Sequence, residues 1–414
     1  MELAPLRRRD FRLLYFGQFV SFFGSMMSYV ALPYALYAAT KSTVLTGLLG
    51  VIQLLPSVVG GLFGGALADA FDRRKLIVGC EIGMALVVLA VGWALHATAP
   101  GYPAAPWLLA AAFALSMFNG VHRPALEALT PQLVPTSEMP AAAVLTSFRG
   151  NVGMIGGPAV AGMLISAGGA YLAFFVDAVT FVLAIGFLLA IENMPKVERA
   201  AEFSLAAVRE GFRYAMSRQV LVGTYVVDIV AMAFSMPNLL FPAVAEQFGG
   251  ANALGWLHAG ISSGAVLAAL TSGRLMRARR HGLLILVAAG SWSLFMLGFG
   301  LAPSFALALV FLVLAGYADM ISGAFRQTIW NQTVPSELRG RLAGIEMISY
   351  LTGPLVGNTQ LGFLAEGVGV QRAIAYSSLI GFAGVCICAR VLPRFRSYVA
   401  SEPEPARAAE TTNA

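Results

Sequence analysis

Ionic chemistry in this 414-residue sequence is concentrated in one short stretch, GLFGGALADAFDRRKLIVG, at residues 61–79. Only 12% of the chain is charged and 58% is hydrophobic. The stretch nevertheless holds five charges within seven positions, which are Asp69, Asp72, Arg73, Arg74 and Lys75. Charge of that density cannot lie in hydrocarbon, so it predicts a turn in water between two membrane helices. Basic residues alone would mark such a turn, but Asp69 at a helix end also predicts a specific partner, either a basic side chain or a facing helix N-terminus.

Charged side chains also occur inside apolar runs, where each is a candidate for proton transfer or substrate binding because a charge in a membrane is costly. Asp228 lies about ten residues into its run, so it is near the middle of the membrane. Asp319 and Arg326 are seven residues apart, which places them two turns apart on one helix face. Arg123 follows Asn119 by one turn in another run. An interhelical salt bridge that only holds the bundle together is the alternative for each.

Other polar residues in the runs are weaker candidates. Asp177 is in a strongly apolar segment, where an interhelical hydrogen bond is the favoured interpretation. Glu346 and Arg149 lie near helix ends and are candidates for an ionic gate, whereas His258 is interpreted as a packed histidine.

Long apolar helices must position these residues. A soluble protein is about 25% charged, so this chain cannot cover its surface with polar groups, and the sequence predicts an all-α membrane protein. A span needs about 20 apolar residues. Twelve runs qualify, at roughly 11–38, 45–68, 76–98, 107–129, 140–168, 170–191, 219–245, 252–275, 282–302, 304–325, 342–366 and 371–392.

The basic residues predict the orientation of these spans. If the N-terminus is cytoplasmic and the helices alternate, then all of the 27 Lys and Arg except Lys41 and Arg372 fall on the cytoplasmic side or at its helix ends. The net charge of +6 therefore marks topology, and no nucleic-acid partner is expected. We expect a multi-pass protein of the cell inner (plasma) membrane with both termini in the cytoplasm.

The chain repeats after 200 residues. Gln132-Leu-Val-Pro135 recurs as Gln332-Thr-Val-Pro335, and Gly157-Pro158 of the fifth span corresponds to Gly353-Pro354 of the eleventh. Two six-helix halves in the same orientation are the simplest interpretation. The expected organisation is a bundle over 1–191, a cytoplasmic linker with an amphipathic helix over 192–218, a second bundle over 219–398, and a disordered tail over 399–414.

The loop at 61–79 resembles the signature of the major facilitator superfamily, G-x-x-x-D-[RK]-x-G-x-[RK]-[RK]. Gly65, Asp69, Arg74 and Lys75 match it, with Arg73 adjacent, and Ala70 and Asp72 depart from it. The form found here, with LRRRDFRLLYFGQFVSFFGS at the start and VPSELRGRLAG at 334–344, is similar to the drug, macrolide and siderophore exporters of that superfamily.

The resemblance implies a fold and several residue roles. It implies twelve transmembrane helices in two pseudo-symmetric six-helix bundles, with spans one, four, seven and ten lining a central cavity. It also implies that Asp69, with Arg73 and Arg74, clasps the cytoplasmic helix ends across the two halves. Many members carry an acid after the glycine of the first span, but Ser25 follows Gly24 here. Proton coupling is therefore expected to use Asp228 or Asp319 instead, and the alternative is that coupling does not operate as it does in those relatives.

The fifth span carries a second motif, with Gly153, Gly157, Pro158 and Gly162. It resembles the G-x-x-x-G-P-x-x-G stretch of antiporters in the superfamily, with one additional residue before the last glycine. Proline removes a helix hydrogen bond and glycine permits close packing, so a kinked packing helix is the alternative to a role in coupling.

The predicted function is a secondary transporter that exports hydrophobic or amphipathic small molecules in exchange for protons. The expected partners are the small-molecule substrate, the proton and the lipid bilayer, and the protein is expected to be a monomer. No metal-ligand cluster, HExxH motif, nucleophile elbow or Walker loop occurs in the sequence, so no cofactor or metal is expected. The alternatives are an importer or uniporter of the same fold, a membrane-embedded enzyme, and a permease subunit that needs a separate ATPase.

Overall fold

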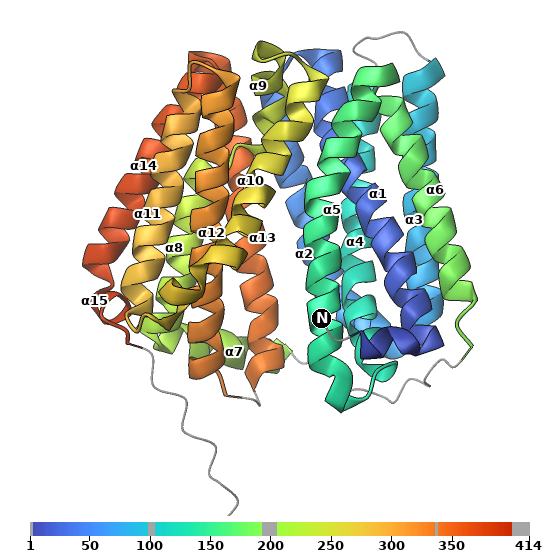
Figure 1. The fold of residues 1–414 in the computed structure, drawn as a ribbon, viewed down its shortest axis with the longest axis horizontal. Helices are drawn as coiled ribbons and strands as arrows, with labels where there is room; N and C mark the ends of the chain where they lie inside the picture. The colour runs from blue at the N-terminus through green and yellow to red at the C-terminus, as the bar shows by residue number, and fades with distance from the viewer. Residues whose placement is uncertain (1–2, 98–103, 193–204, 336–337, 400–414) are drawn as a thin grey trace, which may run out of the picture.

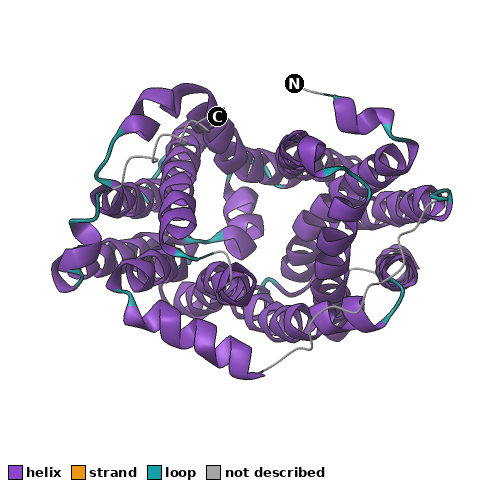
Figure 2. Cartoon of the chain, turned by 90° about the horizontal axis from the view of Figure 1, so that it is seen from below, coloured by secondary structure: helices purple, strands orange, loops and turns teal. Residues whose placement is uncertain are grey.

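The computed structural model describes residues 3–97, 104–192, 205–335 and 338–399, and all regular structure in that part of the chain is helical (Figure 1, Figure 2). Eleven helices in the described residues are long and apolar enough to cross a membrane. A twelfth, α13 (Arg339–Val368), spans 30 residues and is more polar, since it carries Glu346, Asn358 and Gln360. The twelve together form the two six-helix bundles that the sequence predicts.

The N-terminal half holds six membrane helices after a short 3-10 turn, η1 (Ala4–Arg7). They are α1 (Arg9–Thr40), α2 (Thr43–Ala70), α3 (Arg73–Ala97), α4 (Ala104–Leu129), α5 (Met139–Gly168) and α6 (Ala170–Leu189). The 3-10 turns η2 (Thr130–Gln132) and η3 (Thr136–Glu138) connect α4 to α5. In Figure 1 this half occupies the right side of the molecule, in blue to green.

The C-terminal half follows α7 (Leu205–Ser217), which packs against α8 (Gln219–Ser235) and α13. Its further elements are η4 (Asn238–Leu240), α9 (Phe241–Gln247), α10 (Ala251–Thr271), η5 (Ser272–Arg277), α11 (His281–Gly300), α12 (Phe305–Thr333), α14 (Val370–Val391) and α15 (Pro393–Arg396). The predicted tail lies almost wholly outside the described residues.

The seventh span differs from the single helix expected over 219–245. It consists of α8, a break at Met236 and Pro237, η4, and α9. Pro237 has no backbone N–H and its ring crowds the preceding turn, so the helix cannot run through it. Asn358 of α13 satisfies part of the broken backbone by accepting a hydrogen bond from Leu239 N at 2.8 Å.

The repeat in the sequence corresponds to matching geometry in the two halves. Gly169 turns the chain from α5 into α6 with φ of 118°, and Gly369, 200 residues later, turns it from α13 into α14 with φ of 86°. Only glycine adopts such angles without strain. Likewise a Cβ at Gly353 would lie 2.9 Å from the Met232 side chain, and Gly157 is similarly close to the Met26 side chain.

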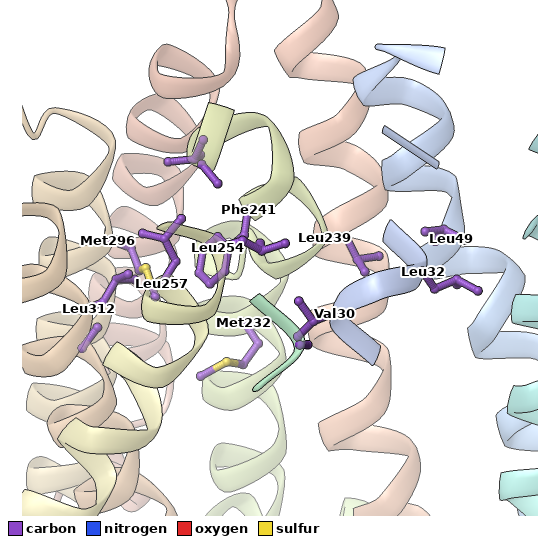
Figure 3. Close-up of a cluster of buried hydrophobic side chains, with 14 of the residues drawn as sticks. Val30, Leu32, Leu49, Met232, Leu239, Phe241, Leu254, Leu257, Met296 and Leu312 are labelled. Atoms are coloured by element: carbon purple, nitrogen blue, oxygen red, sulfur yellow. The ribbon is translucent and has the colours of Figure 1, made fainter. Parts of the chain in front are cut away.

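One apolar core extends through both halves, and the part that joins the two halves lies at the end of the molecule farthest from η1 and α7 (Figure 1, Figure 3). It includes Val30 and Leu49 of the first half and Met232, Phe241 and Leu254 of the second (Figure 3). We call this end the far face and the opposite end, with η1, α7 and α15, the terminal face (Figure 1).

Toward the terminal face the described apolar clusters do not cross between the halves. One contains Leu14, Ile77 and Leu188 of the first half, and another contains Leu221 and Trp330 of the second. The halves are therefore packed together at the far face and separate toward the terminal face.

Candidate substrate and coupling site

A cavity of about 370 Å³ lies in the C-terminal half, where α8, α12 and α13 meet. Its lining is polar and charged, with Thr224, Tyr225, Asp228, Arg326, Glu346 and Ser349 among its residues. Arg326 Nε and Ser349 Oγ are among the buried polar atoms there that have no hydrogen-bond partner among the described residues. The cavity is therefore built to receive a polar group or an ion.

Two predicted candidates, Asp228 and Arg326, line this cavity, and a third, Asp319, lies beside Arg326. The Arg326 guanidinium of α12 binds the Asp228 carboxylate of α8 through Nη1, and its Nη2 lies 4.0 Å from Asp319 Oδ1 on its own helix. The Asp228 side chain is 5% exposed, whereas the Asp319 side chain is 40% exposed. The seven-residue spacing of Asp319 and Arg326 aligns them on one face, and the packing of α8 adds the third charge.

Glu346 of α13 lines the same cavity and is half-buried. Arg326 thus faces three carboxyl groups with a single positive charge. If all three were ionised, two negative charges would lack compensation within the membrane, and this costs several kcal/mol. A proton is the simplest compensating partner.

A larger cavity of about 940 Å³ lies in the N-terminal half, between α1, α2, α4, α5 and α6. Asn119 and Arg123 both line it and are exposed, and the side chain of Arg123 is bound to Glu127, one turn on, with 3.0 Å between Nε and Oε1. Leu351 of α13 also contributes, so the cavity is bordered by the other half. The polar candidates of the two halves therefore occupy two different cavities.

The weaker candidates are also placed. Asp177 of α6 is buried at the edge of the larger cavity and accepts hydrogen bonds from Ser28 Oγ and, at 3.1 Å, from Thr180 Oγ1. Arg149 of α5 lines this cavity as well. His258 is buried between the rings of Tyr29 and Phe241, with centroid distances of 5.8 and 4.9 Å.

One buried charge is absent from the candidates that the sequence suggested. Glu81 of α3 is fully buried, and its Oε1 accepts a hydrogen bond from Gln18 Nε2 at 2.7 Å and lies 3.3 Å from His122 Nε2. The signal was present, because Glu81 is the only acid in the apolar run 76–98.

The charged loop between α2 and α3 binds its own half. Asp72 caps α3 by accepting a hydrogen bond from Lys75 N at 3.1 Å. Arg73 donates to the carbonyl of Ala128 at 3.2 Å, and Arg74 donates to the carbonyl of Leu189. The side chain of Asp69 and the surroundings of Gly65 lie outside the described residues.

The α5 motif lies at two helix–helix contacts, one with α1 of the same half and one with α10 of the other half. A Cβ at Gly153 would lie 2.5 Å from the Phe22 ring of α1, and one at Gly162 would lie 3.1 Å from Gly255 Cα of α10. Pro158 is buried, and its carbonyl oxygen would lie 2.9 Å from a Cβ at Gly255. The motif thus brings the backbones of the two halves into contact near the far face.

Comparison with known proteins gives consistent results. Residues 1–411 match a family described as transmembrane secretion effector. The enterobactin exporter EntS of Shigella boydii serotype 4 (strain Sb227) is 29% identical over 381 residues, which is 90% of this chain and 88% of that protein. The enterobactin exporter EntS of Escherichia coli O1:K1 / APEC is 29% identical over the same shares.

Solved structures share the fold. The nucleoside transporter NupG superposes with a TM-score of 0.71 at 14% identity, covering 93% of this chain and 98% of that one. A bacterial homologue of the iron transporter ferroportin, in an inward-facing state, gives a TM-score of 0.70 at 14% identity, with 96% and 100% covered.

Proposed function

Because the chain belongs to the transmembrane secretion effector family of the major facilitator superfamily, and is a membrane transporter rather than an enzyme, we propose that it exports amphipathic small molecules in exchange for protons. The observation that carries this proposal is the cluster in which Arg326 faces Asp228, Asp319 and Glu346. A cluster with fewer positive than negative groups binds a proton when water reaches it and releases the proton on the other side.

Alternating access exposes the proton-binding cluster first to one side of the membrane and then to the other. The halves are packed at the far face, through contacts such as Thr359 Oγ1 to Gly47 O at 2.9 Å and Thr43 Oγ1 to Gly362 O at 3.0 Å. With both termini in the cytoplasm of an inner-membrane protein, the present arrangement is open to the cytoplasm. Asp69 with Arg73 and Arg74 would then close this side in the opposite state, whereas the α5 motif maintains the far-face seam in the present state.

The larger cavity supports the substrate class. It combines apolar side chains, including Phe22, Met26 and Tyr29, with Gln18, Asn119 and Arg123. An apolar wall with a few polar groups binds a ligand that has a large hydrophobic surface and a few hydrogen-bonding groups. A siderophore such as the enterobactin of the named relatives is one such compound, and hydrophobic drugs are others.

Transport in proteoliposomes under an imposed pH gradient tests the proposal. Enterobactin and a panel of amphipathic dyes serve as probes, with wild type, Asp228→Asn and the control Glu192→Gln, which removes an exposed carboxylate at the membrane surface. We expect the gradient to drive accumulation by wild type and the control. Asp228→Asn should lose the response to the gradient and retain exchange of the probe down its own gradient.

Three results would contradict the proposal. If Asp228→Asn accumulated the probe as wild type does, the Asp228 carboxyl group would have no role in proton coupling. Transport by wild type that ignores the pH gradient would identify a uniporter, and accumulation in the same direction as proton flow would identify an importer.

Full transport activity of the protein in liposomes that hold one copy each would support the expected monomer.

A further inference from the structure

Glu81, His122 and Gln18 join three helices of the N-terminal half at one point. Glu81 is 0% exposed on α3, and its Oε1 meets Gln18 Nε2 of α1 at 2.7 Å and His122 Nε2 of α4 at 3.3 Å. The acidic cluster at Arg326 lies in the other half, so this group is separate from it. The site described above makes no use of these three residues as a unit.

The group contains no arginine or lysine. Of the basic residues close to it in sequence, Arg123 binds Glu127 with Nε and Oε1 3.0 Å apart, and Arg74, two turns before Glu81, donates to the carbonyl of Leu189. The second carboxylate oxygen, Glu81 Oε2, is buried and has no hydrogen-bond partner among the described residues. An ionised carboxylate held only by neutral donors, with one oxygen unsatisfied, is expensive at this depth.

The ionisable groups on the neighbouring helices are few in the described part of the chain. On α3 the neighbour is the Cys80 thiol, and on α4 the group is His122 itself. The acid of α6, Asp177, lies beside Gly24 and Ser28 of α1, which follow Gln18 by six and ten residues, so it is about 9–15 Å farther along that helix. His122 is thus the titratable side chain in contact with the Glu81 carboxyl group in the described part of the chain.

We propose that Glu81 and His122 form a proton-binding site in the N-terminal half. With Glu81 ionised and His122 neutral the pair carries one negative charge, and uptake of one proton on either Glu81 Oε1 or His122 Nε2 brings the pair to zero. The proton comes from water in the cavity and returns to it, and no other bond is made or broken. Because the two atoms share one proton, the titration belongs to the pair and not to either residue.

The larger cavity gives the proton its route. His122 and Gln18 both line that cavity, while Glu81 lies behind them. His122 is also next to Arg123, which borders the open space between the halves. Proton uptake by the pair is therefore possible in the present arrangement, and its use in transport rests on the proposed proton-coupled export.

Infrared difference spectroscopy tests the site without any substrate. Purified protein in lipid nanodiscs is titrated from about pH 5 to about pH 9, and the carbonyl band of protonated carboxyl groups is followed. We expect one component of this band to titrate in wild type, to be lost in Glu81→Gln, and to persist in the control Glu192→Gln. In His122→Asn the midpoint of that component should move, because the partner of the carboxyl group is removed.

Two outcomes would overturn the site. A wild-type titration with no component that Glu81→Gln removes would make the three residues a static link between helices. An unmoved midpoint in His122→Asn would separate the histidine from the carboxyl group. If Glu81→Gln does not fold, the His122→Asn midpoint still decides, and failure of wild type to transport in a pH gradient refutes the proposed function alone.

Discussion

The seam between α2 and α13 at the far face has no room for a side chain at Gly47. A Cβ added there would lie 2.7 Å from Asn358 O and 2.8 Å from Gly362 Cα, and both are backbone atoms. Real Cβ atoms do not approach backbone so closely, so Gly47→Val cannot be accommodated while the far face is closed. We predict that this substitution shifts the protein toward the state that is open at the far face.

The size of the shift follows from the packing. Additional methyl groups in a well-packed interface cost about 1–3 kcal/mol. The cost applies only to the closed far face, since α2 and α13 separate there in the other state. The ratio of the two states should therefore change about 5-fold to 150-fold in favour of the state open at the far face.

Distances between spin labels measure this ratio, in protein whose three native cysteines are replaced by serine. Labels at the exposed positions of Ser166 and Asn252 report on the far-face ends of α5 and α10. Labels at Ser137 and Arg277 report on the terminal-face ends that precede α5 and follow α10. In Gly47→Val the first distance should lengthen and the second should shorten.

The matched control is Gly79→Val in α3, because a Cβ at Gly79 has no atom within 4 Å. It introduces the same side chain into a membrane helix and should leave both distance distributions as in wild type. Identical distributions for Gly47→Val and wild type would refute the reasoning, as would equal shifts in both variants. If Gly47→Val does not insert, Gly47→Ala gives a smaller shift in the same direction.

Two further predictions concern charges at the faces. Asp69→Asn should insert normally and transport about tenfold more slowly, because a charge-assisted contact that closes the terminal face is worth about 1.5–3 kcal/mol. The distance between labels at Ser137 and Arg277 should lengthen on average. Transport by this variant at the wild-type rate would refute the role of Asp69 in closing the terminal face. Lys41→Met breaks an ion pair with Glu246 that has 2.5 Å between Nζ and Oε1, but both side chains are more than half exposed, with 60% and 52%. Such pairs contribute at most about 1 kcal/mol, so transport in proteoliposomes should change less than about fivefold, and a larger loss would make this pair a gate.

The sequence was sufficient for the membrane class, the number of spans and their pairing into two halves, since these depend on apolar run lengths and on a repeat. It also aligned Asp319 with Arg326, because helical periodicity alone decides that two residues seven apart share a face. That Asp228 joins them could not be derived, since this depends on the rotation of α8 against α12.

Other features depend on packing that one sequence does not encode locally. The glycines of α5 signalled close approach, yet only the fold assigns Gly153 to α1 and Gly162 to the other half. The sequence predicted one helix over 219–245, and the fold breaks it at Pro237, where Asn358 accepts a hydrogen bond from the interrupted backbone. Glu81 was readable as an intramembrane acid, but its partners come from helices 63 and 41 residues away in the chain.

The glycine seam at the far face has a consequence for how easily the halves part. The groups that touch there, at Gly47, Gly362, Gly162 and Gly255, are main chain and hydrogen atoms, and the charged pair of Lys41 and Glu246 stays at the wetted rim. Separation of these surfaces leaves no unpaired charge buried in the membrane, and the helices keep their internal hydrogen bonds as water enters. Closure therefore depends on shape and on buried apolar surface, without ion pairs inside the membrane, which suits a contact that must form and break on every turnover.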